Sequence, residues 1–220
     1  MATFALVHGA WHDGWCWHLF EERLRARGHE TVAPTLPIED VDASFDDYAD
    51  VVAAALEPDG GRIVVVGHSV AGRWLHLVAE RRPVALSVYL CPRLPDRDGQ
   101  PRAFRPDAVA GDLDDELGRS TWSAEGAAWM YARLPPVLAT AAAERLRPQF
   151  FGMIDREASP DLRALPSAAI ACRDDEFLSL EYERWAAREL LGAPPLELDG
   201  GHFPMLEQPD RLGAALEELA

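Results

Sequence analysis

The sequence predicts an α/β fold: a mostly parallel central sheet flanked by helices, with a short helical cap inserted into it. Short apolar segments alternate with helical segments along most of the chain, which is typical of parallel strands joined by right-handed crossovers. One segment, Ile63-Val64-Val65-Val66, is an unbroken β-branched run, as expected of a strand buried on both faces. Residues 92–166 interrupt the alternation with frequent prolines and charges.

The elements expected in the sheet follow from this alternation. The expected strands are short and apolar: 3–7, 31–33, 63–66, 84–90, 168–172 and 196–198. The expected helices lie between and after them: 17–27, a helix starting at 44, a helix ending near 82, 179–191 and 209–220. In the first helix Trp17, Phe20 and Leu24 recur on one face, and Ser44 with Asp47 three residues later forms a capping box.

The central stretch is interpreted as an insertion that covers something rather than as part of the sheet. Helices are expected near 124–133 and 138–146, and no strong strand is expected there. We therefore divide the single domain into a core, residues 1–91 and 167–220, and a cap, residues 92–166.

Composition excludes several classes of partner. The 220 residues carry 21 basic and 37 acidic side chains, a formal net charge of −16. Such a chain repels phosphate backbones and anionic bilayers, so we expect a small-molecule substrate and neither nucleic acid nor membrane as partner. No signal peptide is recognisable, and three dispersed cysteines indicate no disulfide framework. We expect a cytoplasmic protein, either a monomer or a homodimer.

The segment Gly67-His68-Ser69-Val70-Ala71-Gly72 follows the β-branched strand and precedes a helix. It matches the Gly-x-Ser-x-Gly nucleophile pattern, with Ala71 in the last place. A nucleophilic serine must sit on a sharp turn so that its hydroxyl projects from the sheet, and only small residues fit two positions to either side. The pattern therefore predicts Ser69 as a nucleophile.

Acyl transfer also needs two backbone N–H donors for the oxyanion, a base and an acid. Val70, directly after the nucleophile, is one expected donor, and Ala10 in His8-Gly9-Ala10-Trp11 is the other. His202 is the one histidine beyond the insertion and is the expected base. The acid should follow the strand at 168–172, where spacing does not choose between Asp174 and Asp175.

No cofactor is expected. His8, His12 and His18 lie close together in sequence, but no zinc-binding spacing is present, so we interpret the cluster as chance and expect no metal. Neither a GxGxxG nor a Walker motif supports a nucleotide cofactor. His68, beside the nucleophile, is interpreted as a packing residue.

Taken in order, these motifs resemble the α/β-hydrolase superfamily, specifically its small esterase and hydroxynitrile-lyase-like branch, which includes plant methyl-salicylate-type esterases and bacterial relatives. The resemblance implies Asp175 as the acid, because the family's acid stands eleven positions, counted inclusively, before a helix tryptophan, here Trp185. It also implies Ala10 and Val70 as oxyanion donors. By analogy with family caps, Trp129 and Tyr131 are candidate substrate contacts, with packing inside the cap as the alternative.

Two departures from the family pattern matter. The hydroxynitrile lyases carry a threonine in the oxyanion loop and a lysine after the catalytic histidine, where this chain has Gly9 or Ala10, and Phe203. Cyanogenic lyase activity is therefore not expected. Val70 replaces the longer unbranched residue common after the nucleophile, which reshapes the pocket floor.

The leading hypothesis is a carboxylesterase-like serine hydrolase that cleaves a small, largely apolar ester through Ser69, His202 and Asp175. One alternative keeps the site but changes the reaction to that of a lyase, cyclase or acyltransferase of specialised metabolism. Another is a ligand-binding receptor on the same fold.

Overall fold

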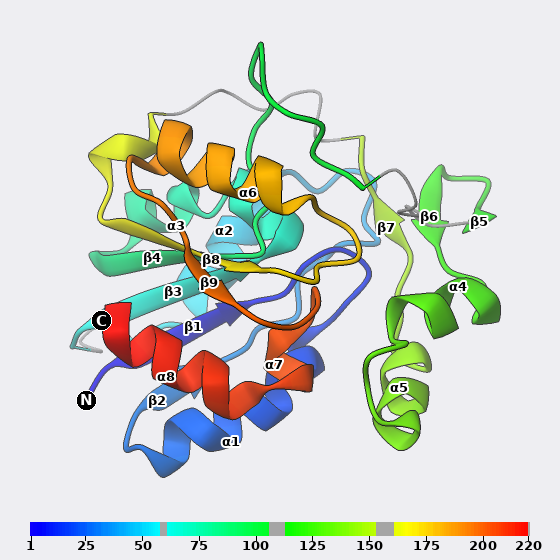
Figure 1. Cartoon of the computed structure of the whole chain (residues 1–220), viewed down its shortest axis with the longest axis horizontal. Helices are drawn as coiled ribbons and strands as arrows, with labels where there is room; N and C mark the ends of the chain where they lie inside the picture. Colours follow the sequence, from blue (N-terminus) through cyan, green and yellow to red (C-terminus); the bar gives the residue numbers. More distant parts are fainter. Residues whose placement is uncertain (58–60, 106–112, 153–160, 220) are drawn as a thin grey trace.

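A parallel sheet forms the centre of the molecule, as seen in the computed structural model, which describes residues 1–57, 61–105, 113–152 and 161–219 (Figure 1). Its strands are β1 (Thr3–Val7), β2 (Glu30–Val32), β3 (Ile63–His68), β4 (Val84–Leu90), β8 (Ser167–Cys172) and β9 (Leu196–Leu198). They lie in the order β2-β1-β3-β4-β8-β9, and every neighbouring pair is parallel. The α/β class and the mostly parallel sheet predicted from the sequence are confirmed.

Helices cover both faces of this sheet. The bounds are α1 (His18–Ala26) and α8 (Pro209–Leu219) on one face, and α2 (Phe45–Ala54), α3 (His76–Arg81) and α6 (Leu180–Ala186) on the other. The alternation of side chains along β1 divides the core accordingly. Phe4 and Leu6 pack in the layer of α1 and α8. Ala5 and Val7 pack in the layer of α2, α3 and α6.

Local sequence explains where these helices begin and break. Ser44 caps α2: its hydroxyl accepts from the backbone N–H of Asp47, whose carboxylate accepts from the Ser44 N–H, so the predicted capping box is confirmed. The helix expected to end near residue 82 is instead two pieces. A short 3-10 helix, Ser69–Arg73, precedes α3 because the sharp turn at residue 69 leaves room for only a tight first turn.

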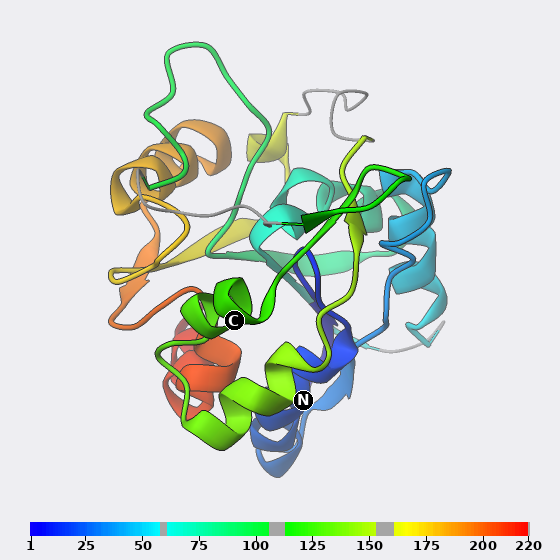
Figure 2. The same cartoon turned by 90° about the vertical axis from the view of Figure 1, so that its right-hand side faces the viewer.

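The segment between β4 and β8 holds a second, antiparallel sheet of β5 (Leu113–Asp114), β6 (Arg119–Thr121) and β7 (Gln149–Phe150). It also holds two helices, α4 (Ala124–Met130) and α5 (Pro136–Ala143). Figure 2 looks at the molecule from the side on which these elements lie. The sequence led us to expect no strong strand here, and the strands present have only two or three residues, too few to show an alternating pattern. We call residues 92–166 the cap; its status as a separate unit stays a prediction.

Two further observations concern the cysteines and the lengths of the helices. All three cysteines are buried and free. Within the described ranges, no helix combines the length and the apolar character needed to cross a bilayer.

Candidate active site

Ser69 is the first residue of the 3-10 helix and lies on a strained turn directly after β3. Its φ of 54° is in the left-handed region, which non-glycine residues rarely adopt. Neighbouring residues must be small: a Cβ on Gly67 would come within 2.8 Å of the Leu75 side chain, and Ala71 is fully buried. The backbone N–H of Arg93, just after β4, donates to the carbonyl of Ser69 at 2.9 Å and holds the turn from outside. The geometry matches the predicted nucleophile elbow.

A cavity of about 340 Å³ lies beside this turn. Four of the side chains predicted for the site line it: Ala10, Ser69, Val70 and His202. Aromatic side chains make up much of the remaining wall: Trp11, Phe104, Phe151, Phe177 and Phe203. One wall is charged, with Arg73 and Arg93 both paired to Asp96. The cavity is therefore a largely apolar space whose wall includes the serine and the histidine.

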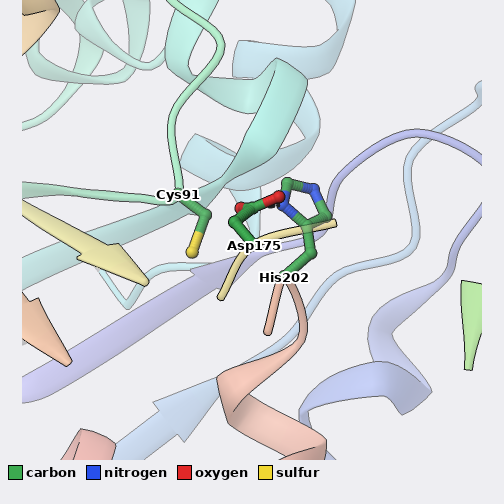
Figure 3. A group of neighbouring side chains, drawn as sticks. All are labelled: Cys91, Asp175 and His202. Atoms are coloured by element: carbon green, nitrogen blue, oxygen red, sulfur yellow. Dashed lines mark hydrogen bonds and ion pairs between the residues drawn. The ribbon is translucent and has the colours of Figure 1, made fainter. Parts of the chain in front are cut away.

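Asp175 and His202 form a buried pair at this cavity (Figure 3). The imidazole Nδ1 of His202 donates to Oδ2 of Asp175 at 2.5 Å, and the two residues are 4% and 1% exposed. The other oxygen, Oδ1, accepts from the backbone N–H groups of Phe177 at 2.7 Å and Leu178 at 2.8 Å. The carboxylate is therefore fixed, and it directs Nε2 of His202 away from itself.

The structure distinguishes the two candidate acids that spacing left open. Asp174 is exposed and lies 3.6 Å from Arg133 in an ion pair, so it does not reach His202. The carboxylate of Glu176 instead accepts from the backbone N–H of His202 at 3.0 Å. Burial raises the pKa of Glu176. Of the three carboxylates in this turn, only Asp175 contacts the imidazole.

His68 does more than pack. Its Nε2 donates to the carbonyl of His202 at 2.8 Å and so holds the loop that carries the expected base. Burial lowers the pKa of His68 well below its ordinary value, which keeps the ring neutral. A link between residues 134 positions apart leaves no signal in sequence spacing, which is why it was missed.

The loop that carries Ala10 lies against the serine. A Cβ on Gly9 would meet Nδ1 of His68 at 2.9 Å and Cβ of Ser69 at 3.1 Å, so this close approach requires glycine. Nδ1 of His8 donates to the Gly9 carbonyl at 2.8 Å, and Nε2 of His8 accepts from the N–H of Leu36 at 3.0 Å. Burial lowers the pKa of His8 to about 3, so its ring is neutral and can play both roles.

His12 makes an equivalent pair of bonds on the other side of Ala10. Its Nδ1 donates to the Ala10 carbonyl at 2.6 Å, and its Nε2 accepts from the hydroxyl of Tyr131 at 2.7 Å. Burial lowers the pKa of His12 to about 4 and raises the pKa of Tyr131 well above its ordinary value. Both groups are therefore neutral, and the histidines interpreted as a chance cluster include two that hold the loop.

The two candidate substrate contacts lie outside the cavity lining. Tyr131 is buried against His12, while Trp129 packs on Phe177 with ring centroids 5.0 Å apart and stacks on Trp122. Their contact with substrate stays a prediction. Phe151 and Phe177 line the cavity and were not singled out from sequence, because isolated aromatic residues carry no motif. Phe203, noted from sequence only as a departure from the lyase pattern, lines it as well.

Among the described residues, one set of metal-ligating side chains converges: Cys91, Asp175 and His202, with ligand atoms all within 4.8 Å of one another (Figure 3). The set does not suit a metal ion. Oδ2 of Asp175 and Nδ1 of His202 are hydrogen-bonded to each other, so neither atom is free to bind a metal ion. Burial raises the pKa of the Cys91 thiol and keeps its sulfur protonated, whereas a metal ion binds the thiolate.

A parallel sheet carrying a serine on a strained strand–helix turn, with a buried histidine–aspartate pair at the same cavity, defines the α/β-hydrolase class. The chain belongs to the alpha/beta hydrolase family, whose model matches residues 4–215.

Several proteins similar to this chain carry the names of esterases, as expected from the branch that its motifs resemble. Methylesterase 2 of Arabidopsis thaliana is 24% identical over 99% of this chain and 95% of its own length. Norfluorocurarine synthase 1 of Strychnos nux-vomica is 23% identical over 99% of this chain and 95% of its own. The crystal structure of polyneuridine aldehyde esterase superposes with a TM-score of 0.78 at 22% identity and covers both chains completely. The resemblance to this branch is confirmed.

Proposed function

We propose that the protein is a carboxylic ester hydrolase that cleaves a small, largely apolar ester through Ser69, His202 and Asp175. The observation that carries the proposal is the buried Asp175–His202 hydrogen bond at a cavity that Ser69 also lines. The relatives named as esterases and methylesterases support the same class of reaction. We further propose that the enzyme is cytoplasmic and acts as a monomer or homodimer.

The proposed reaction follows from the roles that these groups can play. Ser69 attacks the ester carbonyl while Nε2 of His202 takes the hydroxyl proton, and Asp175 holds the ring and stabilises the imidazolium. The N–H groups of Ala10 and Val70 donate to the oxyanion of the tetrahedral intermediate. His202 then gives the proton to the leaving alcohol. Water repeats these steps on the acyl-enzyme and releases the acid.

The lining of the cavity favours an ester with few polar groups as the substrate. Its wall includes the aromatic side chains of Trp11, Phe151, Phe177 and Phe203. Three charged side chains that line the cavity pair with one another: Arg73 and Arg93 contact Asp96 at 3.2 Å and 2.5 Å. Apolar walls stabilise apolar acyl or alkyl groups by removing their surface from water.

Active-site labelling with a fluorophosphonate, followed by peptide mapping, tests this proposal. We expect the wild type to be labelled at Ser69 and the Ser69→Ala variant to remain unlabelled and to lose turnover of p-nitrophenyl butyrate by roughly 10⁴-fold. Turnover by Ser69→Ala at the wild-type rate would refute the assignment of the nucleophile.

A second reaction class is supported by one observation. A relative that is similar over nearly the whole chain is named a synthase, which supports a lyase, cyclase or acyltransferase reaction as the alternative. A panel of simple methyl and aryl esters separates the two: release of acid and alcohol from several of them favours hydrolysis. Labelling of Ser69 without any ester turnover favours the lyase, cyclase or acyltransferase alternative. Tight ligand binding with neither labelling nor turnover favours a receptor.

A further inference from the structure

Two histidines hold the peptide groups on either side of Ala10. The Gly9 carbonyl accepts from His8 and the Ala10 carbonyl accepts from His12, at 2.8 Å and 2.6 Å. Because a trans peptide is planar, fixing the Gly9 carbonyl also fixes the direction of the Ala10 N–H, which points the opposite way. Fixing the next carbonyl prevents the backbone of Ala10 from rotating.

The outer ends of the two histidines are held by different parts of the molecule. Nε2 of His8 accepts from the backbone of Leu36, within the core. Nε2 of His12 accepts from the hydroxyl of Tyr131, at the end of α4 in the cap. A neutral imidazole has one donor and one acceptor, so a hydroxyl that donates to Nε2 keeps the proton on Nδ1. Tyr131 thus selects the tautomer in which His12 can donate to Ala10.

Trp11, the next residue, is strained and is also held by the cap. Its φ is 63°, a conformation that persists in a bulky residue only when the surroundings impose it. Its carbonyl accepts from the N–H of Arg147 at 2.9 Å, and its indole N–H donates to the carbonyl of Ser120 at 3.1 Å. The cap therefore contacts the oxyanion loop through several hydrogen bonds, of which the Tyr131–His12 bond is directly connected to Ala10.

We propose that Tyr131 and His12 are positioning residues through which the cap orients the oxyanion-binding N–H of Ala10. The proposal rests on the proposed function, because it assigns a task to the oxyanion loop of that site. It also gives Tyr131 a role different from substrate contact: its hydroxyl acts on the rate of bond formation through His12, whereas a residue of the pocket wall acts on affinity.

Saturation kinetics of Ser69 phosphonylation by a fluorophosphonate separate these roles, because they yield the affinity (KI) and the rate of bond formation (kinact) with one probe. In Tyr131→Phe we expect kinact to fall about tenfold, since a misdirected oxyanion donor loses part of its stabilising effect. KI should stay within twofold of wild type. Tyr89→Phe, which removes a hydroxyl buried in β4, is the matched control and should change neither constant.

His12→Asn tests whether Tyr131 acts through His12. The side-chain amide of asparagine can place an N–H where Nδ1 of His12 lies, and an amide has no tautomer that depends on Tyr131. We expect His12→Asn to keep most of the wild-type kinact, and Tyr131→Phe to cost nothing further in that background. Thermal unfolding checks that each variant is folded. Comparing His12→Asn with the double variant His12→Asn/Tyr131→Phe tests the proposal even where Tyr131→Phe alone is unstable.

The outcomes are distinct. An unchanged kinact in folded Tyr131→Phe, or a rise in KI that accounts for the whole loss, overturns this inference and leaves the proposed function intact. An equal loss from Tyr131→Phe in the wild-type and His12→Asn backgrounds also overturns it. A wild-type protein that is not labelled at Ser69 overturns the proposed function and this inference with it.

Discussion

Replacing Glu183 by glutamine should stabilise the protein relative to the wild type, and this difference should grow as the pH rises. Glu183 lies on α6, is 1% exposed, and neither carboxyl oxygen has a hydrogen-bond partner among the described residues. Burial, followed by the nearby negative charge of Asp175, raises the pKa of Glu183 well above its ordinary value. The folded protein therefore keeps this acid protonated at a pH where the unfolded chain has already ionised it.

The sign of the effect follows from the number of bound protons. Because the folded pKa is the higher one, the contribution to stability is complete below the unfolded pKa and is lost as the pH rises through the folded value. Where only the unfolded chain ionises, the free energy of unfolding falls by about 1.4 kcal/mol per pH unit. The loss continues until the pH reaches the folded pKa, and each pH unit removes a sizeable part of a typical total of about 5–15 kcal/mol.

Urea unfolding of the wild type and of Glu183→Gln at pH 5, 6 and 7 measures how much Glu183 contributes to the free energy of unfolding at each pH. Glutamine has nearly the same size but does not ionise, so the stability of Glu183→Gln relative to the wild type should rise with pH. The rise should be about 1.4 kcal/mol for each pH unit that lies between the unfolded and the folded pKa of Glu183. Glu181→Gln is the matched control, because Glu181 lies exposed on the same helix and should show no such trend. Parallel stability curves for the wild type and Glu183→Gln would refute the argument.

Three further predictions concern the site and one helix. Asp175→Asn should lower kcat for p-nitrophenyl butyrate by about 10³-fold or more because the carboxylate fixes the imidazole, whereas Asp174→Asn should change it less than twofold; equal losses would contradict the assignment. Gly9→Ala should slow phosphonylation of the serine at least about tenfold, because its Cβ would press on His68, while circular dichroism shows a folded chain. Ser44→Ala should lower the free energy of unfolding by about 1 kcal/mol through loss of the α2 cap, and an unchanged value in urea unfolding would exclude the cap as a stabilising element.

Most of the sheet could be predicted from sequence because β1, β3, β4 and β8 are largely apolar segments, and helical segments separate most of the strands along the chain. The β-branched run in β3 and the cap residue of α2 are local signals, and both led to the observed elements. The antiparallel sheet of the cap could not be predicted in this way. β5 and β7 have two residues each, and their pairing with β6 depends on how the cap packs rather than on periodicity.

In the candidate site, the features with local motifs were predictable and the long-range contacts were not. The turn at Ser69 follows from its small neighbours. The choice between Asp174 and Asp175 needs the direction of two adjacent side chains, which spacing does not supply. The contact of His12 with Tyr131 joins residues 119 positions apart, and nothing in either local sequence indicates it.

The position of the cap in the chain has a consequence for how this enzyme family diversifies. β4 and β8 are neighbours in the sheet, and a connection of about a dozen residues suffices to join two parallel strands. The chain uses residues 91–166 for that connection. Most of this length is not required to complete the sheet, so insertions, deletions or exchange of the segment with that of a relative leave the strand order unchanged. Substrate range can therefore evolve, or be engineered, within one continuous piece of the gene, provided that a new segment restores the contacts to the loop that carries Ala10.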